Sequence, residues 1–393
     1  MGAVARPHGQ GLADDDGLTQ ATTRIPLSRP YLGEREEELV LDVLRSGRLS
    51  LGPVIEHFEE LVAERVGAPY AVALSSGTAG LHLLCRAAGL GPGDEAITSP
   101  FSFVASANCF VLEGATPVFA DIDPRTLNLD PVAVEAAVTE RTKAIVAVDI
   151  FGYSCELDEL SVIAEKHGLV LIDDSCEALG AEYKGAPLGS QGPSAVFAFY
   201  PNKQVVTGEG GVVTTHSEAE WKLLRSLRNQ GRSYESGRWF HHPYLGFNYR
   251  WTDLQAAVGV AQLEKLDEIL ELRSAAAARY AELLADVDGV ALPLEDDGDH
   301  VRSWFVYVVL LDEAVDRAQV TAELGAQGIE CGEYLPCIHL QPYMREAYGF
   351  GEGLCPAAED ASRRTLALPF FAQLEREDQE RVAACLRAAL SRS

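Results

Sequence analysis

Short apolar runs that alternate with helix-forming segments are the feature that most constrains the fold of this chain. Strand-like runs occupy residues 70–74, 95–98, 116–122, 144–150 and 169–172, and helical patterns lie between them at residues 81–88, 102–112, 131–138 and 157–166. This alternation predicts an α/β fold with a largely parallel sheet and helices on both faces. Two later runs, at residues 195–200 and 211–215, are joined by a glycine-rich segment too short for a crossover helix, so we expect them to be antiparallel to part of the sheet.

The pattern changes in the second half of the chain. Residues 251–284 predict one long helical stretch with a break near its start, and we place a domain boundary inside it. A strand at residues 304–311 and helices at residues 317–327 and 375–391 follow. The expected organisation is a disordered tail at residues 1–24, a large domain at 25–260 and a smaller C-terminal α+β domain at 261–393.

Composition excludes several classes of function. Among the 393 residues, Lys and Arg number 32 against 59 Asp and Glu, a net charge of −27 that opposes binding to nucleic acid or anionic membranes. No run approaches the roughly 18 to 20 apolar residues that a membrane span needs, and no apolar run follows Arg6 as it would in a secretory signal. The 8 cysteines lack C-x-x-C spacing, so neither zinc nor disulfides are expected. We therefore expect a cytoplasmic protein.

Three short stretches carry candidate chemistry. Ser75-Ser-Gly-Thr-Ala-Gly80 joins a strand to a helix N-terminus, where free amides and the helix dipole favour a phosphate, although a tight turn without a ligand is the alternative. Asp174 ends a buried strand, where a carboxylate can hold a heteroaromatic nitrogen protonated or simply cap a helix. Lys203 lies among apolar and aromatic residues before a glycine-rich turn, where burial would make its amine a nucleophile, the alternative being a surface lysine before a hairpin.

The combination is more specific than its parts. A phosphate anchor, then an aspartate at a strand end, then a buried lysine are the three groups that pyridoxal 5'-phosphate (PLP) needs. The chain resembles the DegT/StrS sugar aminotransferases, which have the fold type I of the aspartate aminotransferase superfamily. The resemblance runs from Ile25 to about Leu390 and is carried by Ser50-Leu-Gly-Pro, Ser75-Ser-Gly-Thr-Ala-Gly-Leu-His, Ile172-Asp-Asp-Ser-Cys-Glu-Ala, Tyr200-Pro-Asn-Lys-Gln, Gly246-Phe-Asn-Tyr-Arg and Ile338-His-Leu-Gln-Pro-Tyr.

The resemblance implies a role for each matching residue. Lys203 falls on the Schiff-base lysine that also carries the proton, and Asp174 on the partner of the pyridinium nitrogen. Phe103 falls on the aromatic residue that stacks on the cofactor. The phosphate cup is implied to be Gly77, Thr78 and Ala79, with Asn248 reaching the phosphate of the neighbouring subunit in a homodimer with composite sites. Further cofactor and substrate contacts are implied for Glu177, Tyr200, Arg250, Tyr334 and His339.

Two positions depart from the family pattern. Ala198 stands where many members have a serine that binds the phosphate, which removes one hydrogen bond worth about 0.5 to 1.5 kcal/mol. Glu177 stands where glutamine is commoner, and a carboxylate facing the cofactor's ring oxygen is expected to have a raised pKa. Some relatives that act on nucleotide-linked 4-keto sugars share this glutamate.

The resemblance implies amino transfer from an amino acid, with L-glutamate the expected donor, to a 3-keto or 4-keto deoxyhexose on a nucleoside diphosphate. A keto-cyclitol acceptor stays open. Two other rivals are a sugar dehydratase, which would carry histidine in place of Lys203, and a sensor that binds a ligand without catalysis.

Histidines suggest alternative sites. His241 and His242 lie in an aromatic segment with Trp239 but lack the further ligands that a metal needs, so no metal is expected. His82 is expected to cap or pack in its helix. For His339, a substrate contact and a structural loop histidine both stay open.

Overall fold

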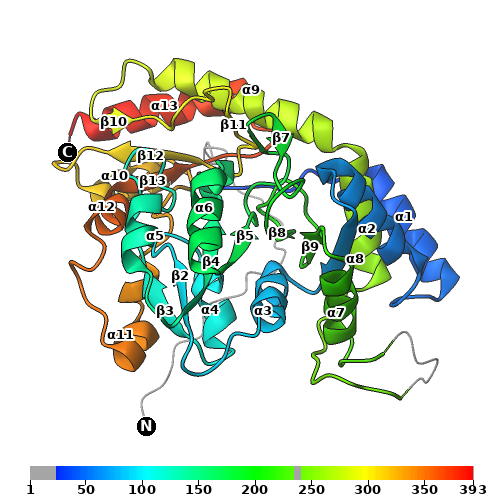
Figure 1. Cartoon of the computed structure of the whole chain (residues 1–393). Helices are drawn as coiled ribbons and strands as arrows, with labels where there is room; N and C mark the ends of the chain where they lie inside the picture. Colours follow the sequence, from blue (N-terminus) through cyan, green and yellow to red (C-terminus); the bar gives the residue numbers. More distant parts are fainter. Residues whose placement is uncertain (1–23, 234–239, 393) are drawn as a thin grey trace, which may run out of the picture.

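A seven-stranded sheet forms the centre of the protein, as seen in Figure 1, in a computed structural model that describes residues 24–233 and 240–392. The strand order is β1-β9-β8-β5-β4-β2-β3. The strands are β1 (Tyr70–Leu74), β2 (Glu95–Thr98), β3 (Thr116–Phe119), β4 (Thr142–Val148), β5 (Val170–Asp174), β8 (Ser194–Ala198) and β9 (Gly211–Thr215). Strand β9 runs antiparallel to β1 and β8, and the other neighbouring pairs are parallel. The predicted mostly parallel sheet is therefore confirmed. Of the two runs expected to be antiparallel to part of it, β9 is antiparallel to both of its neighbours, whereas β8 runs parallel to β5 and is antiparallel only to β9.

Helices cover both faces of this sheet because its central strands are apolar on both sides. One face packs against α3 (Gly77–Ala87), α4 (Ala105–Val111) and α7 (Glu218–Arg228). The other packs against α2 (Pro53–Val66), α5 (Pro131–Ala137), α6 (Leu157–His167) and α8 (Asp253–Glu264). Helix α1 (Glu34–Ser46) lies against α8. The two apolar cores that result hold the strand ends, and the side chains after them, in fixed positions.

A second, three-stranded sheet follows in the chain, in the antiparallel order β10 (Val290–Ala291), β12 (Tyr307–Leu311) and β13 (Thr365–Leu368). Helices α9 (Leu266–Leu284), α10 (Arg317–Ala326) and α13 (Arg376–Leu390) pack around it, with α9 and α13 side by side in Figure 1. Strand β12 begins three residues after the predicted start because Trp304 has a φ of 53°, outside the extended region. The long helical stretch breaks at Lys265 and not near its start, so the prediction was wrong on this point.

Several contacts join segments that lie far apart in the chain. Strand β11 (His300–Val301) pairs with β6 (Glu182–Tyr183), which pairs with β7 (Ala186–Pro187). Ile25 forms a parallel bridge with Ile329 and lies in the C-terminal core. The division at residues 260 and 261 stays a prediction, and residues 1–23 of the expected tail lie outside the described part. The remaining elements are η1 (Ile150–Gly152), η2 (Ile338–Leu340), α11 (Pro342–Tyr348) and α12 (Pro356–Arg364).

Within the described residues, no helix is both long enough and apolar enough to cross a bilayer. The cysteines of the chain are free thiols, and most of them are buried.

Candidate active site

Lys203 lies in the glycine-rich segment that connects β8 to β9. Its backbone N–H donates to the Tyr200 carbonyl at 2.9 Å, which closes a turn. Its Nζ lies 3.5 Å from Glu177 Oε1 and 3.9 Å from the centre of the Phe305 ring, and its side chain is only 13% exposed. The amine is therefore largely shielded from water, as the sequence predicted, with one carboxylate and one aromatic face beside it.

Asp174 is the last residue of β5, and its side chain faces α4. Ser106 on that helix donates its hydroxyl to Asp174 Oδ2 at 2.7 Å, and Ser102 Oγ lies 2.7 Å from Ser106 Oγ. The backbone N–H of Cys176 donates to Asp174 Oδ1 at 3.3 Å. These contacts hold the buried carboxylate in one orientation at the end of a parallel strand, where ligands of α/β sheets bind.

Asp173 points to the opposite face because successive strand residues alternate. The Ser175 hydroxyl lies 3.0 Å from Asp173 Oδ2 and 2.6 Å from Asp149 Oδ2. Burial raises the pKa of Asp149 to about 6, and burial together with Asp149 raises the pKa of Asp173 well above its usual range. Asp173 is therefore part of a buried, proton-holding cluster behind the strand, which leaves Asp174 as the carboxylate on the side of α4.

Glu177 links the lysine to the chain that follows β4. Its Oε2 accepts the Phe151 N–H at 2.9 Å, and Gln204 Nε2 donates to its carbonyl at 2.6 Å. Burial raises the pKa of the Glu177 carboxyl, although nearby Lys203 opposes the shift. This direction agrees with the expectation, but the cause in the structure is burial.

The N-terminus of α3 lies against the ends of β5 and β8. Ser76 caps the helix by accepting the Ala79 N–H at 3.1 Å. A Cβ added to Gly77 would lie 2.8 Å from Ala198 Cβ and 2.8 Å from Cys176 Sγ, so only glycine allows this approach. The first amides of a helix lack partners within the helix and favour an anion. Ala198, where the family pattern has serine, is thus directly beside the expected cup.

Other expected site residues differ in their placement. Phe103 and Tyr200 are 62% and 54% exposed, and Asn248 is also exposed, with a backbone bridge to Asn229. Tyr334 packs against Phe305, with ring centres 6.1 Å apart, and so belongs to the Lys203 environment.

Arg250 and His339 form polar contacts within the chain. Arg250 donates to Asn229 Oδ1 at 3.0 Å. His339 is fully buried, with Nε2 3.1 Å from Glu359 Oε1. A side chain without exposed surface favours the structural interpretation of His339 over a substrate contact.

The sequence analysis missed residues that complete the site. Ser106 orients Asp174, Phe305 covers the lysine amine, and Ser303 accepts a hydrogen bond from Gln204 Nε2 at 2.7 Å. In the sequence, the four-residue spacing of Ser102 and Ser106 was the one pattern that could have indicated the contact with Asp174. Phe305 lies in a distant part of the chain, and no local pattern links it to Lys203.

The histidine alternatives do not assemble a metal site. His242 Nδ1 lies 2.9 Å from the Gln230 carbonyl, and Trp239 lies outside the described residues. Across residues 24–233 and 240–392, no group of three His, Cys, Asp or Glu side chains is arranged to hold a metal ion.

Comparisons with known proteins identify the family to which the chain belongs. The chain is 40% identical over 376 residues to the spore coat polysaccharide biosynthesis protein SpsC of Bacillus subtilis, covering 92% of this chain and 96% of SpsC. It is 40% identical over 372 residues to GDP-perosamine synthase of Caulobacter vibrioides, covering 93% and 98%. The crystal structure of DesV from S. venezuelae matches with a TM-score of 0.86 and 34% identity, over 93% and 98% of the two chains. A sequence model of the DegT/DnrJ/EryC1/StrS aminotransferase family matches residues 30–387, so the chain belongs to this family.

Proposed function

We propose that this aminotransferase uses PLP to move an amino group from L-glutamate to a keto sugar carried on a nucleoside diphosphate. The observation that carries the proposal is the meeting of three groups at the strand ends: the shielded Lys203 amine, the oriented Asp174 carboxylate and the glycine-lined N-terminus of α3. Family membership supports the reaction, and GDP-perosamine synthase, whose name refers to a nucleotide-linked amino sugar, supports the class of acceptor.

The residues present fit PLP. Lys203 would hold its aldehyde, Asp174 its ring nitrogen and the α3 N-terminus its phosphate. The absence of a Cβ at Gly77 lets that N-terminus pack closely on Ala198 and Cys176 at the strand ends. When bound, PLP supplies an electron sink for the pair released as a C–H bond beside nitrogen breaks.

The chain's own groups supply orientation and proton transfer. Asp174, fixed by the Ser106 hydroxyl, keeps a proton on the ring nitrogen because a carboxylate favours the cationic partner. The Lys203 amine accepts the proton that leaves the donor carbon and delivers it to its new position. Glu177, 3.5 Å from Nζ, and the Phe305 face restrain the amine between those two positions.

A homodimer with composite sites is part of the proposal. Phe103 is 62% exposed although its expected role is to cover a cofactor, and the exposed Asn248 has the short polar side chain that could reach a neighbour's phosphate. Both features fit a partner subunit that completes each site. A keto-cyclitol acceptor is the second candidate, whereas Lys203 and Asp174 together argue against a dehydratase or a sensor without catalysis.

The test is incubation of the enzyme with glutamate and a panel of keto sugar nucleotides and keto cyclitols, with mass spectrometry of the amines. We expect 2-oxoglutarate and an aminated sugar nucleotide. Lys203→Ala should form neither product and should purify without the colour of bound PLP. Near wild-type turnover by Lys203→Ala would refute the mechanism, and amination of cyclitols alone would refute the acceptor.

A further inference from the structure

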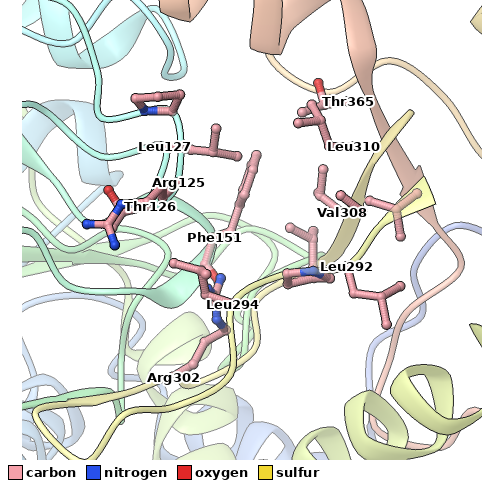
Figure 2. Close-up of a pocket in the computed structure, with 15 residues that line it drawn as sticks. Arg125, Thr126, Leu127, Phe151, Leu292, Leu294, Arg302, Val308, Leu310 and Thr365 are labelled. Carbon is pink, nitrogen blue, oxygen red and sulfur yellow. The ribbon is translucent and has the colours of Figure 1, made fainter. Parts of the chain in front are cut away.

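A cavity of about 230 Å³ lies between the loop after β3 and the small sheet, and neither Lys203 nor Asp174 lines it. Its wall is mostly apolar. In Figure 2, Leu127 and Phe151 face Val308 and Leu310 of β12 across the cavity. Phe151 also contacts the candidate active site, because its backbone N–H donates to Glu177 Oε2 at 2.9 Å.

Arg302 places a buried cation in this wall. The residue is 7% exposed, and its guanidinium lies over the rings of Tyr153 and Trp304, at 4.6 and 5.0 Å. Its side chain donates a long hydrogen bond from Nη1 to the Phe151 carbonyl at 3.5 Å, and its buried Nε has no acceptor among the described residues. Burial lowers the pKa of Arg302 to about 10. The charge is thus desolvated, and the two ring faces stabilise it in part but supply no hydrogen-bond acceptor for its N–H groups.

The carboxylates around Arg302 do not neutralise it directly. Asp296 uses Oδ1 to accept the Arg302 backbone N–H at 3.1 Å, and among the described residues no carboxylate oxygen lies within 4.0 Å of the guanidinium. The cavity's second cation, Arg125, is 77% exposed in its side chain and pairs with Asp123 at 3.2 Å. Of the two cavity cations, Arg302 is therefore the one without a direct ion pair, because the Asp296 carboxylate acts on it only from beyond 4.0 Å. The cavity is thus suited to a single negative charge rather than two.

We propose that this cavity is a binding site for a small organic monoanion, a carboxylate with a short apolar body. The carboxylate accepts hydrogen bonds from the planar Arg302 guanidinium, whose donor geometry matches its two oxygens. The apolar body lies against Phe151, Leu127 and the β12 side chains, as in ligand pockets that combine apolar walls with a few polar anchors. A dianionic phosphate would leave an unmatched charge in apolar surroundings beside Asp296.

Hexanoate is the probe, with hexanamide as its neutral match and hexyl phosphate as the dianion. Binding to the full-length protein is measured by calorimetry and located by chemical-shift changes of the Val308 and Leu310 methyl groups. We expect hexanoate to shift these methyls and to bind at least about tenfold more tightly than hexanamide or hexyl phosphate. No binding, equal binding of hexanamide, or tighter binding of hexyl phosphate would each overturn the proposal.

Variants identify the cation that binds the probe. Arg302→Met should weaken hexanoate binding by at least about tenfold, whereas Arg125→Ala, at the exposed rim, should change it by less than about threefold because solvent screens its charge. If Arg302→Met does not fold, Leu294→Trp decides the matter, since it fills the cavity and keeps the cation. Unchanged affinity in the folded Arg302→Met, or in Leu294→Trp when it replaces that variant, would contradict the assignment.

Discussion

Gly77→Ala tests whether the N-terminus of α3 anchors the phosphate of PLP. The added Cβ would lie 2.8 Å from both Ala198 Cβ and Cys176 Sγ, against ordinary contacts of about 3.5 to 4.0 Å. The helix start must therefore move by about 1 Å, or the strand ends must give way. Overpacking of this kind costs about 1 to 3 kcal/mol.

The cost should appear mainly in cofactor binding. Without PLP the helix start can move away and relieve the contact, whereas phosphate binding requires it in place. Affinity for PLP should thus fall by about 5- to 150-fold, measured by titrating the apo protein and following tryptophan fluorescence. Thermal unfolding reports separately on the fold.

Matched variants make the result specific. Gly91→Ala is the control, because a Cβ there meets nothing within 4 Å. Replacing Ala198 by Gly and Cys176 by Ala removes both contacts, so adding Gly77→Ala to that background should change affinity by less than about threefold. If Gly77→Ala alone binds PLP within threefold of wild type, α3 does not anchor the phosphate in the way proposed.

Three further predictions concern charges and subunits. Asp174→Asn can keep its hydrogen bond from Ser106 but not its charge, so the protein should fold and turn over glutamate at least about tenfold more slowly, equivalent to 1.4 kcal/mol; a smaller loss in steady-state rate would exclude Asp174 as the ring-nitrogen partner. Mixing Lys203→Ala and Asn248→Asp chains should restore activity towards about a quarter of wild type through heterodimers with one intact site, and no recovery despite exchange of tagged subunits would exclude a contribution of Asn248 to its neighbour. Asp149, with its pKa raised to about 6 from 3.8, favours folding when neutral, so its contribution is present at low pH and is lost as pH rises through 6. Relative to Asp149→Asn, the wild type should lose about 2 kcal/mol of unfolding free energy between pH 4 and 7, and parallel pH profiles in urea unfolding would contradict this.

Local patterns were enough to predict the large sheet. Each of its strands is a short apolar run between turn-forming residues, and such a run is buried wherever the sheet is covered on both faces. The position of Asp174 could be predicted in the same way because it ends such a run, and Lys203 follows the end of β8 within a short turn. The placement of a residue at a strand end can be predicted because the strand fixes its position, whereas the chemical roles of Asp174 and Lys203 stay predictions.

Contacts between distant segments could not be predicted in this way. The pairing of the two-residue strands β6 and β11 has no periodicity to detect, and the break at Lys265 interrupts an otherwise helical sequence. Phe305 reaches Lys203 only because the small sheet packs beside the large one. His339 belongs to a family motif, yet its full burial depends on Glu359 and Phe119, which no local pattern links to it.

The residues that surround Lys203 come from parts of the chain that the ribosome synthesises after the lysine itself. Arg273 Nη2 donates to the Lys203 carbonyl at 3.3 Å, Gln204 donates to Ser303, and Phe305 covers the amine. Ile25, in turn, pairs with Ile329. Synthesis proceeds from the N-terminus at about 5 to 20 residues per second. Phe305 is therefore added to the chain several seconds after Lys203. A nascent chain that ends before Phe305 lacks the aromatic cover of its reactive amine, so the site is completed late, when most of the polypeptide has already been made.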